Sequence, residues 1–393
     1  MMKVAVISIY TFPLGMAATN RIAAYTQGLA ENGADVTVLI PAPAEPFDSK
    51  SILPDVGEYN GVEYRHLSGR KRNRNKIIRG IASLSGIRNL IGAVKSFKWL
   101  SRNRPDFVII SNDEPAYLRL YNRICRFLRI KTIFIFDEYP TPIRHYLKTD
   151  IPEKKKKQYR KILPHFSAYI SITKKLQDFY NGFAVKPCFL MPVIVNTSRF
   201  ENIPLSPKKC ISYIGNMDLT KDSVDDIIKA FSRIVSDNPE LTLRLYGNPD
   251  DKSKETIVRL IEELGLQNKA LLMGRIPSDE VPKAISESMI MVSAQPDTRR
   301  AEGGFPTKLG EYLAMGVPTV MSDVGENSQY VTERDCYFVD PGNIKDYANT
   351  LSGIIANYET SLKRAANGKK TVRVNYSHHA IGKKLLMFLN GLE

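Results

Sequence analysis

Cysteine is scarce in this sequence, and the few cysteines form no recognisable site. Each stands alone, with no CxxC or CxxH spacing: Cys125, Cys188, Cys210 and Cys336. This arrangement argues against a disulfide framework and against a zinc site. No histidine accompanies them in a pattern typical of a catalytic thiol, so we expect all four to be core residues.

Long apolar runs are also missing. No run approaches the roughly 18 residues that a membrane-spanning helix needs. The first residues, "MMKVAVISIY", lack the charged region, apolar core and cleavage site of a signal peptide. We therefore expect a cytoplasmic protein. Its 393 residues, 43% of them hydrophobic, suffice for two folded domains of roughly 200 residues each.

Acidic residues are few in the first half of the chain. Residues 1–200 hold 32 Lys and Arg against 15 Asp and Glu, whereas the remainder holds 24 against 26. The net charge of +15 therefore belongs to the first half, and residues 64–105 contain twelve Lys or Arg and no acid. No aromatic-rich strand or nucleic-acid motif accompanies this charge, so we expect no nucleic-acid partner.

Short β-branched runs alternate with helical patterns in both halves, which predicts an α/β protein with two Rossmann-like, doubly wound parallel sheets. The runs in the first half are 3–10, 35–40, 107–111, 131–136 and 167–172. Those in the second half are 210–215, 241–247, 269–274, 289–294 and 318–322. An amphipathic helix follows the first run and ends at Gly33, the expected residue after a helix C-terminus.

The proline-containing stretch 201–209, "ENIPLSPKK", interrupts these patterns and predicts a domain boundary. We therefore expect an N-terminal domain over 1–203, a C-terminal domain over 204–375, and a closing helix over 376–393. We expect that amphipathic helix to pack back towards the first domain.

In open α/β sheets, ligands bind beyond the carboxyl ends of the strands, and the stretch 301–320 occupies such a position. "AEGGFPTKLGEYLAMGVPTV" predicts a helix that begins at Pro306, whose free backbone N–H groups could bind an anion. The two preceding glycines would let a phosphate approach, Lys308 would add a mobile charge, and Glu311 could accept ribose hydroxyls. A capped helix after a glycine turn is the alternative interpretation.

The run "GFPTKLGEYLAMGVPTV" resembles the donor-site motif of the retaining GT-B glycosyltransferases of family 4, glycosyltransferase group 1. The resemblance extends in order through "YTFPLGMAATNRIAAYTQGLAENGADVTVL", "FDEYP", "YIGNMDLTKDSVDDIIKAF" and "LLMGRIPSDEVPKAISESMIMVSAQPD". It implies a GT-B fold, in which two Rossmann-like domains face each other across a cleft and a C-terminal helix crosses back.

The same resemblance implies the donor-binding residues. Glu311 would contact the ribose, Lys221 and Lys308 the diphosphate, and Arg275 the base. The implied donor site comprises Gly15, Asn216, Lys221, Gly274, Arg275, Gly303, Gly304, Phe305, Thr307, Lys308, Leu309 and Glu311.

Three positions depart from the family pattern. The first motif glutamate is displaced by one residue, to Glu302, because position 303 is glycine; Asn216 stands where an arginine is usual; and Phe136 replaces a histidine before Asp137. We take Glu302 and Asp137 as catalytic candidates. The acceptor-side candidates are Asp113, Glu114, Glu138 and Arg144, each of which could instead cap a loop or be a surface charge.

The resemblance implies a retaining transferase that moves a sugar from a UDP- or GDP-sugar to a lipid-linked or surface-polysaccharide acceptor, such as lipopolysaccharide or capsule. No DxD motif follows a strand, so we expect no metal and no other cofactor. A GT-B-like sugar-nucleotide binding or scaffold protein without turnover is one alternative. A sugar-nucleotide epimerase is another.

Apolar and basic residues interleave in "IIRGIASLSGIRNLIGAVKSFKWL", within the basic segment 64–105. A basic amphipathic helix that carries a tryptophan is typical of an interfacial membrane element, and the run 154–161, "KKKKQYRK", would add attraction for anionic lipid. We therefore expect a peripheral protein on the inner face of the plasma membrane. In the alternative interpretation, the apolar face packs on the first domain's sheet and its charges are solvated.

Overall fold

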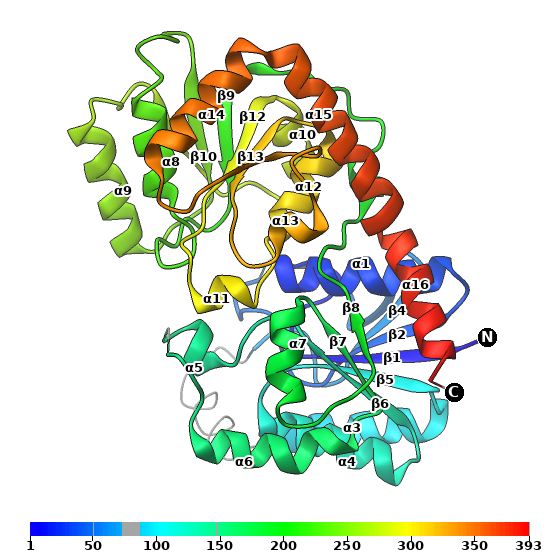
Figure 1. The fold of residues 1–393 in the computed structure, drawn as a ribbon. Helices are drawn as coiled ribbons and strands as arrows, with labels where there is room; N and C mark the ends of the chain where they lie inside the picture. The colour runs from blue at the N-terminus through cyan, green and yellow to red at the C-terminus, as the bar shows by residue number, and fades with distance from the viewer. Residues whose placement is uncertain (50, 73–86, 147, 393) are drawn as a thin grey trace. The chain divides into compact units, whose positions relative to one another are not determined.

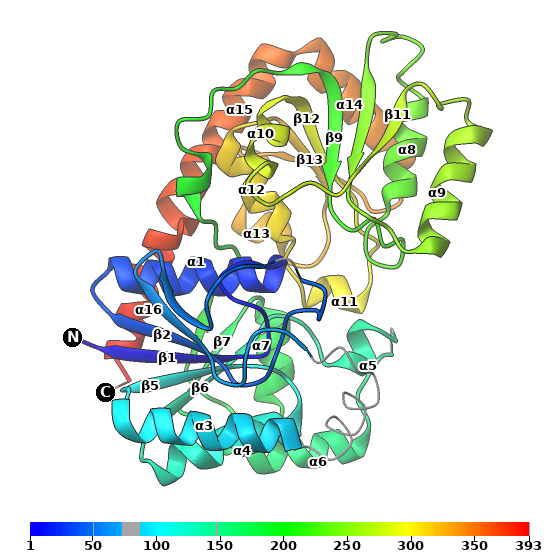
Figure 2. The ribbon, with the colours of Figure 1, turned by 180° about the vertical axis from the view of Figure 1, so that it is seen from behind.

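The chain divides into two compact units, drawn in Figures 1 and 2. The computed structural model describes residues 1–49, 51–72, 87–146 and 148–392. The first unit comprises Met1–Ile194 and His378–Glu393, and the second comprises Val195–Ser377. The division falls before the expected boundary at residue 203, since the Val195 amide donates to the Tyr376 carbonyl at 3.0 Å within the second unit.

The first unit is built on an eight-stranded sheet of order β3-β4-β2-β1-β5-β6-β7-β8. All neighbouring strands are parallel except β3 and β4, an antiparallel pair at one edge. The central strands are continuous runs of buried apolar residues, as a sheet covered on both faces requires. The strands are β1 (Lys3–Ser8), β2 (Asp35–Ile40), β3 (Val56–Tyr59), β4 (Val62–His66), β5 (Phe107–Ser111), β6 (Lys131–Phe136), β7 (Ala168–Ser171) and β8 (Cys188–Leu190).

Helices cover both faces of this sheet. Figures 1 and 2 show α1 and α16 on one side, and α3, α4 and α6 together on the other. The helices are α1 (Ala17–Glu31), α3 (Ile87–Asn103), α4 (Pro115–Phe127), α5 (Thr141–Arg144), α6 (Glu153–Ile162), η1 (Leu163–His165), α7 (Lys174–Asn181) and α16 (His378–Asn390).

The basic segment 64–105 is not one helix. Its first residues belong to strand β4, which pairs with both β2 and β3. Residues 77–86 of the expected amphipathic stretch lie outside the described residues, and the remainder of that stretch lies in α3.

The second unit contains a six-stranded parallel sheet of order β11-β10-β9-β12-β13-β14. Strand order reverses between β9 and β12, as it does between β1 and β5 in the first unit, so both sheets are doubly wound and the predicted α/β class is confirmed. The strands are β9 (Lys208–Ile214), β10 (Thr242–Tyr246), β11 (Ala270–Gly274), β12 (Ser288–Ser293), β13 (Thr319–Ser322) and β14 (Tyr337–Val339). The helices are η2 (Thr197–Phe200), α8 (Val224–Ser232), α9 (Asp251–Glu263), α10 (Val281–Ser286), α11 (Arg299–Glu302), α12 (Thr307–Met315), α13 (Asn327–Tyr330), α14 (Ile344–Ala356), α15 (Tyr358–Thr371) and η3 (Val372–Tyr376).

The closing helix α16 packs directly on α1 in the first unit. A Cβ atom on Gly28 of α1 would lie 1.9 Å from the His378 carbonyl oxygen, and one on Gly382 of α16 would lie 2.1 Å from the Gly28 carbonyl carbon. The two backbones therefore approach too closely for any side chain. His378 Nε2 also lies 3.1 Å from Glu31 Oε1, which joins the same two helices.

Gly28→Ala should destabilise this helix pair, because the added methyl overlaps backbone atoms that cannot move aside singly. We expect the free energy of unfolding to fall by about 1–3 kcal/mol, measured by urea denaturation. Gly353→Ala in α14 is the matched control, since nothing lies within 4 Å of its Cβ position and helix propensity favours alanine by up to about 1 kcal/mol. A loss at Gly28 no larger than the change at Gly353 would contradict the close packing.

Candidate active site

The N-terminus of α12 is an anion-binding arrangement in the second unit. The helix begins at Thr307, and Pro306 is its N-cap with φ −71° and ψ 105°, not its first helical residue as predicted. The Leu309 amide donates to the Pro306 carbonyl at 3.0 Å and so is not free, contrary to the expectation for Leu309. Within the described ranges, the amides of Thr307 and Lys308 have no acceptor. Two donors therefore remain at the positive end of the helix.

Lys308 is held in place and is not the mobile charge that the sequence suggested. Its Nζ lies 2.7 Å from Asp222 Oδ1 and 3.1 Å from the Tyr213 hydroxyl, and 4.3 Å from the centroid of the Tyr213 ring. Asp222 is 2% exposed. A Cβ atom on Gly215 would lie 2.9 Å from this ammonium. Lys308 therefore presents its charge at the end of β9, beside the point where strand order reverses.

Glu311, one turn further into α12, is ion-paired. Its Oε1 lies 2.6 Å from Arg199 Nη1, and the two side chains are 23% and 25% exposed. Arg199, in η2, also donates from Nη2 to the Ser278 carbonyl at 2.6 Å. The carboxylate thus has a fixed orientation and is still reachable from solvent.

The loop before α12 is compact. Helix α11 ends at Glu302, which is half-buried, and Gly303 follows with φ −92°. Neither Gly303 nor Gly304 has a positive φ. Phe305 is buried with its ring centroid 6.1 Å from that of Tyr330, so it packs inward against α13.

The remaining donor-side candidates fall into two groups. Asn216 and Lys221 lie in the loop after β9, the strand that contacts Lys308 through Tyr213; the Lys221 amide donates to the Asp218 carbonyl at 2.8 Å. Gly274 and Arg275 lie at the end of β11, two strands away in the sheet. Gly274 has φ 73°, and its carbonyl accepts from the Gly247 amide at 2.8 Å.

An unpredicted residue lies at the reversal of strand order in the second unit. Gln295 lies two residues after the end of β12, and its backbone amide donates to Ser322 Oγ at 3.2 Å. Its buried Oε1 atom has no hydrogen-bond partner among the residues described. The segment "SAQPD" ends one of the runs that carry the family resemblance, but the sequence does not show which of its side chains is left without a hydrogen-bond partner.

In the first unit, the acceptor-side candidates form one charged cluster. Arg144 lies 3.8 Å from Asp113 and 3.4 Å from Glu138. Lys155 of α6, expected only as part of the lipid-attracting run 154–161, lies 3.8 Å from Asp113 and 3.4 Å from Glu114. The structure therefore brings together residues that follow β5 and β6 at the carboxyl edge of the sheet.

Asp137 belongs to a second ion pair at this edge. Its Oδ1 lies 2.8 Å from Arg21 Nε, and Arg21 in α1 is 4% exposed. Arg21 also donates to the Met191 carbonyl. Burial raises the pKa of Asp137, although Arg21 favours its charged form. Burial and then Asp137 likewise raise the pKa of Tyr10 to about 12.

Gly15 lies in the loop between β1 and α1, where a Cβ atom would be 2.3 Å from Thr19 Oγ1 and 2.6 Å from Thr11 Oγ1. The loop is therefore closed tightly on its own hydroxyl side chains. The family resemblance implied a role for Gly15, but it did not indicate these two threonines.

The described ranges contain neither a metal-binding cluster nor a membrane-spanning helix. No group of three or more His, Cys, Asp or Glu side chains there could hold a metal ion. No described helix has both the length and the apolar composition to cross a membrane.

The raised pKa of Asp137 predicts a pH-dependent stability difference. A native carboxyl whose pKa exceeds its unfolded value binds more protons than the unfolded chain, so stability falls as pH rises through that interval. Asp137→Asn removes this titration. We expect the free energy of unfolding of the variant, minus that of the native protein, to increase between about pH 4 and pH 7, measured by urea denaturation. A decrease would mean that Arg21 outweighs burial.

Comparison with known proteins finds a family match in the second unit. Residues 195–371 match the family described as Glycosyl transferases group 1. An exopolysaccharide phosphotransferase of Streptomyces coelicolor is 27% identical over 134 residues, 34% of this chain; the match spans only 13% of that protein.

Two solved structures show the fold. A sucrose-phosphate synthase from Thermosynechococcus elongatus is 16% identical with a TM-score of 0.73, covering 100% of this chain and 99% of that chain. HepE of Anabaena, solved with UDP-glucose, is 12% identical with a TM-score of 0.70, covering 100% of both chains. These two likenesses confirm the predicted GT-B fold, and the match to the glycosyl transferases group 1 family covers most of the second unit.

Proposed function

We propose that the protein transfers a sugar from a UDP- or GDP-sugar, with the diphosphate bound at the N-terminus of α12. The observation that carries this proposal is the pair of unbonded amides at Thr307 and Lys308, beside a lysine ammonium that Asp222 fixes. A helix N-terminus and a preorganised cation together bind a phosphate without rearranging. The UDP-glucose bound to HepE, which has the same fold, supports this choice of donor.

The proposed reaction retains the anomeric configuration and needs no metal. The departing diphosphate gains negative charge, which the α12 amides, Lys308 and Lys221 would stabilise in place of a divalent cation. Glu311 would accept the ribose hydroxyls while Arg199 holds its Oε1 atom. Glu302, at the end of α11, is our candidate for the sugar-contacting carboxylate. The retaining outcome rests on the resemblance of "GFPTKLGE" to the donor motif of family 4.

The proposed acceptor is a lipid-linked or surface-polysaccharide glycan, such as a lipopolysaccharide or capsule intermediate. Sugar hydroxyls both donate and accept hydrogen bonds. The cluster can serve both roles, because Arg144 donates whereas Asp113 and Glu138 accept. The exopolysaccharide phosphotransferase among the relatives supports a polysaccharide context.

We also propose peripheral binding to the inner face of the plasma membrane through α3. Leu90, Val94 and Phe97 are 63%, 60% and 38% exposed on this helix. Lys98 and Arg102, which are also exposed, add positive charge. An exposed apolar row bordered by cations is typical of a helix that lies in a lipid interface.

A nucleotide-release assay tests the enzymatic proposal. Purified protein is incubated with UDP- and GDP-sugars, with and without lipid-linked acceptors, and without added metal. We expect nucleotide release that depends on acceptor and persists in EDTA. Binding in a thermal-shift screen without any release would indicate a non-catalytic sugar-nucleotide protein, and conversion of donor without acceptor would indicate an epimerase.

Lys308→Met should lower the rate of nucleotide release about 10²–10³-fold, the cost of removing one preorganised charge from a transition state. It should also lower the melting temperature, because Asp222 is left as an unpaired buried charge. Adding Asp222→Asn should restore the melting temperature but not the rate. Lys345→Met, at an exposed site on α14, is the matched control. A double variant with the native rate would disprove the role of Lys308.

A further inference from the structure

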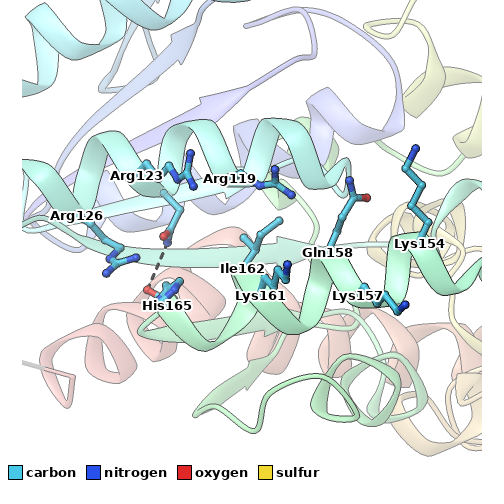
Figure 3. A pocket seen from close by; sticks show the side chains of 10 residues that line it. Arg119, Arg123, Arg126, Lys154, Lys157, Gln158, Lys161, Ile162 and His165 are labelled. Atoms are coloured by element: carbon cyan, nitrogen blue, oxygen red, sulfur yellow. Dashed lines mark hydrogen bonds between the residues drawn. The ribbon is translucent and has the colours of Figure 1, made fainter.

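A basic groove lies between α4 and α6 in the first unit. Figure 3 shows arginines along one helix and lysines along the other. They line a hollow of about 500 Å³. Its lining includes no acidic residue. Its charged lining residues are Arg119, Arg123, Arg126, Lys154, Lys157 and Lys161, with His165 at one end.

The two rows of cations follow from helical spacing. Arg119, Arg123 and Arg126 share a face of α4, as do Lys154, Lys157 and Lys161 on α6. Each row extends about 10 Å at 1.5 Å per residue. The floor is neutral and buried, formed by Asn122 and Ile162, and Asn122 Nδ2 donates to Thr132 Oγ1 at 2.7 Å.

The cations of α6 are divided between its two sides. Lys155 pairs with Asp113 and Glu114, Lys156 with Asp150 and Glu153, and Arg160 with Glu153. In contrast, none of the six groove cations makes a hydrogen bond or an ion pair with a described residue. Positive charge is therefore concentrated in the groove without an intramolecular counter-charge, as expected for a site that binds an anion.

An apolar border adjoins the groove. Phe127, next to Arg126 at the end of α4, is 77% exposed, and its ring centroid lies 6.0 Å from that of Phe97 on α3. Val94, one turn before Phe97, is 60% exposed. The same helical layer thus presents cations between α4 and α6, and exposed aromatic and aliphatic side chains on α3 and at the end of α4.

We propose that the groove between α4 and α6 binds the phosphate headgroups of anionic membrane lipids, while Phe127 and the exposed row on α3 enter the hydrocarbon boundary. This inference rests on the proposed peripheral membrane binding and goes beyond it, because it assigns the headgroups to a site that lies outside α3. Arginine guanidinium groups suit this ligand, since they can donate two parallel hydrogen bonds to one phosphate.

The apolar border distinguishes a lipid from a soluble polyanion. An acidic glycan or a free phosphate needs only the charges, and it would leave Phe127 and Val94 in water. A lipid bilayer offers phosphates and hydrocarbon at adjacent depths, so it satisfies both halves of the surface at once.

Vesicle binding by the full chain tests this proposal. Arg123→Gln with Lys157→Gln should lower the partition coefficient onto phosphatidylglycerol-containing vesicles about 30-fold, since each basic residue near an anionic surface contributes roughly fivefold. Lys252→Gln with Lys254→Gln, which removes two exposed charges from α9, should change binding by less than about twofold at physiological salt. Equal losses in the two pairs would overturn the groove as a specific site.

A second arm identifies the source of the anion. Phe127→Ser should weaken binding to these vesicles and leave binding of soluble polyphosphate unchanged. Polyphosphate binding that requires Arg123 and Lys157, combined with vesicle binding that requires neither, would overturn the lipid in favour of a soluble polyanion.

The matched α3 variant, Val94→Ser, separates this inference from the membrane proposal on which it rests. If that variant loses vesicle binding while the groove variants keep it, the groove proposal fails and the α3 proposal stands. Nucleotide release with a soluble acceptor should be native-like in all these variants.

Discussion

The ion pair between Lys308 and Asp222 is the interaction on which the proposed donor site depends. Without Asp222, the Lys308 ammonium would lie against the Tyr213 ring with no counter-charge, which is costly because the ammonium has been removed from water. With it, the ammonium lies fixed at the end of β9 beside two unbonded helix amides. The strand-order reversal between β9 and β12 leaves space at that edge of the sheet.

The first unit differs in how its positive charges are paired. It carries the excess positive charge of the chain, and the structure divides that charge into two kinds. Lys155, Arg144 and Arg21 are neutralised by carboxylates at the carboxyl edge of the sheet. The cations between α4 and α6 are not neutralised. The total charge is a property of composition, but its availability to a ligand depends on which helix face each residue occupies.

Much of the fold could be predicted because each buried parallel strand can be recognised from its own short stretch of sequence. The runs 35–40, 107–111 and 131–136 coincide with β2, β5 and β6, since a strand covered on both faces needs a continuous apolar run. The partners of the site residues could not be predicted. Asp222 and Lys308 are 86 positions apart, and Arg199 and Glu311 are 112 apart, so only the folded chain shows that they meet. The basic groove could not be predicted either, because it forms between α4 and α6 and only the lysine run of α6 stood out in the sequence.

The position of α16 has a consequence for the order of folding. The first unit consists of residues 1–194 and the last helix of the chain, with the whole second unit between them. The contact between Glu31 and His378, which are 347 residues apart, can therefore form only after the second unit has been synthesised. During synthesis the face of α1 around Gly28 stays uncovered until α16 has left the ribosome. The unit that begins first is thus completed last, and a truncated chain would expose that face to solvent.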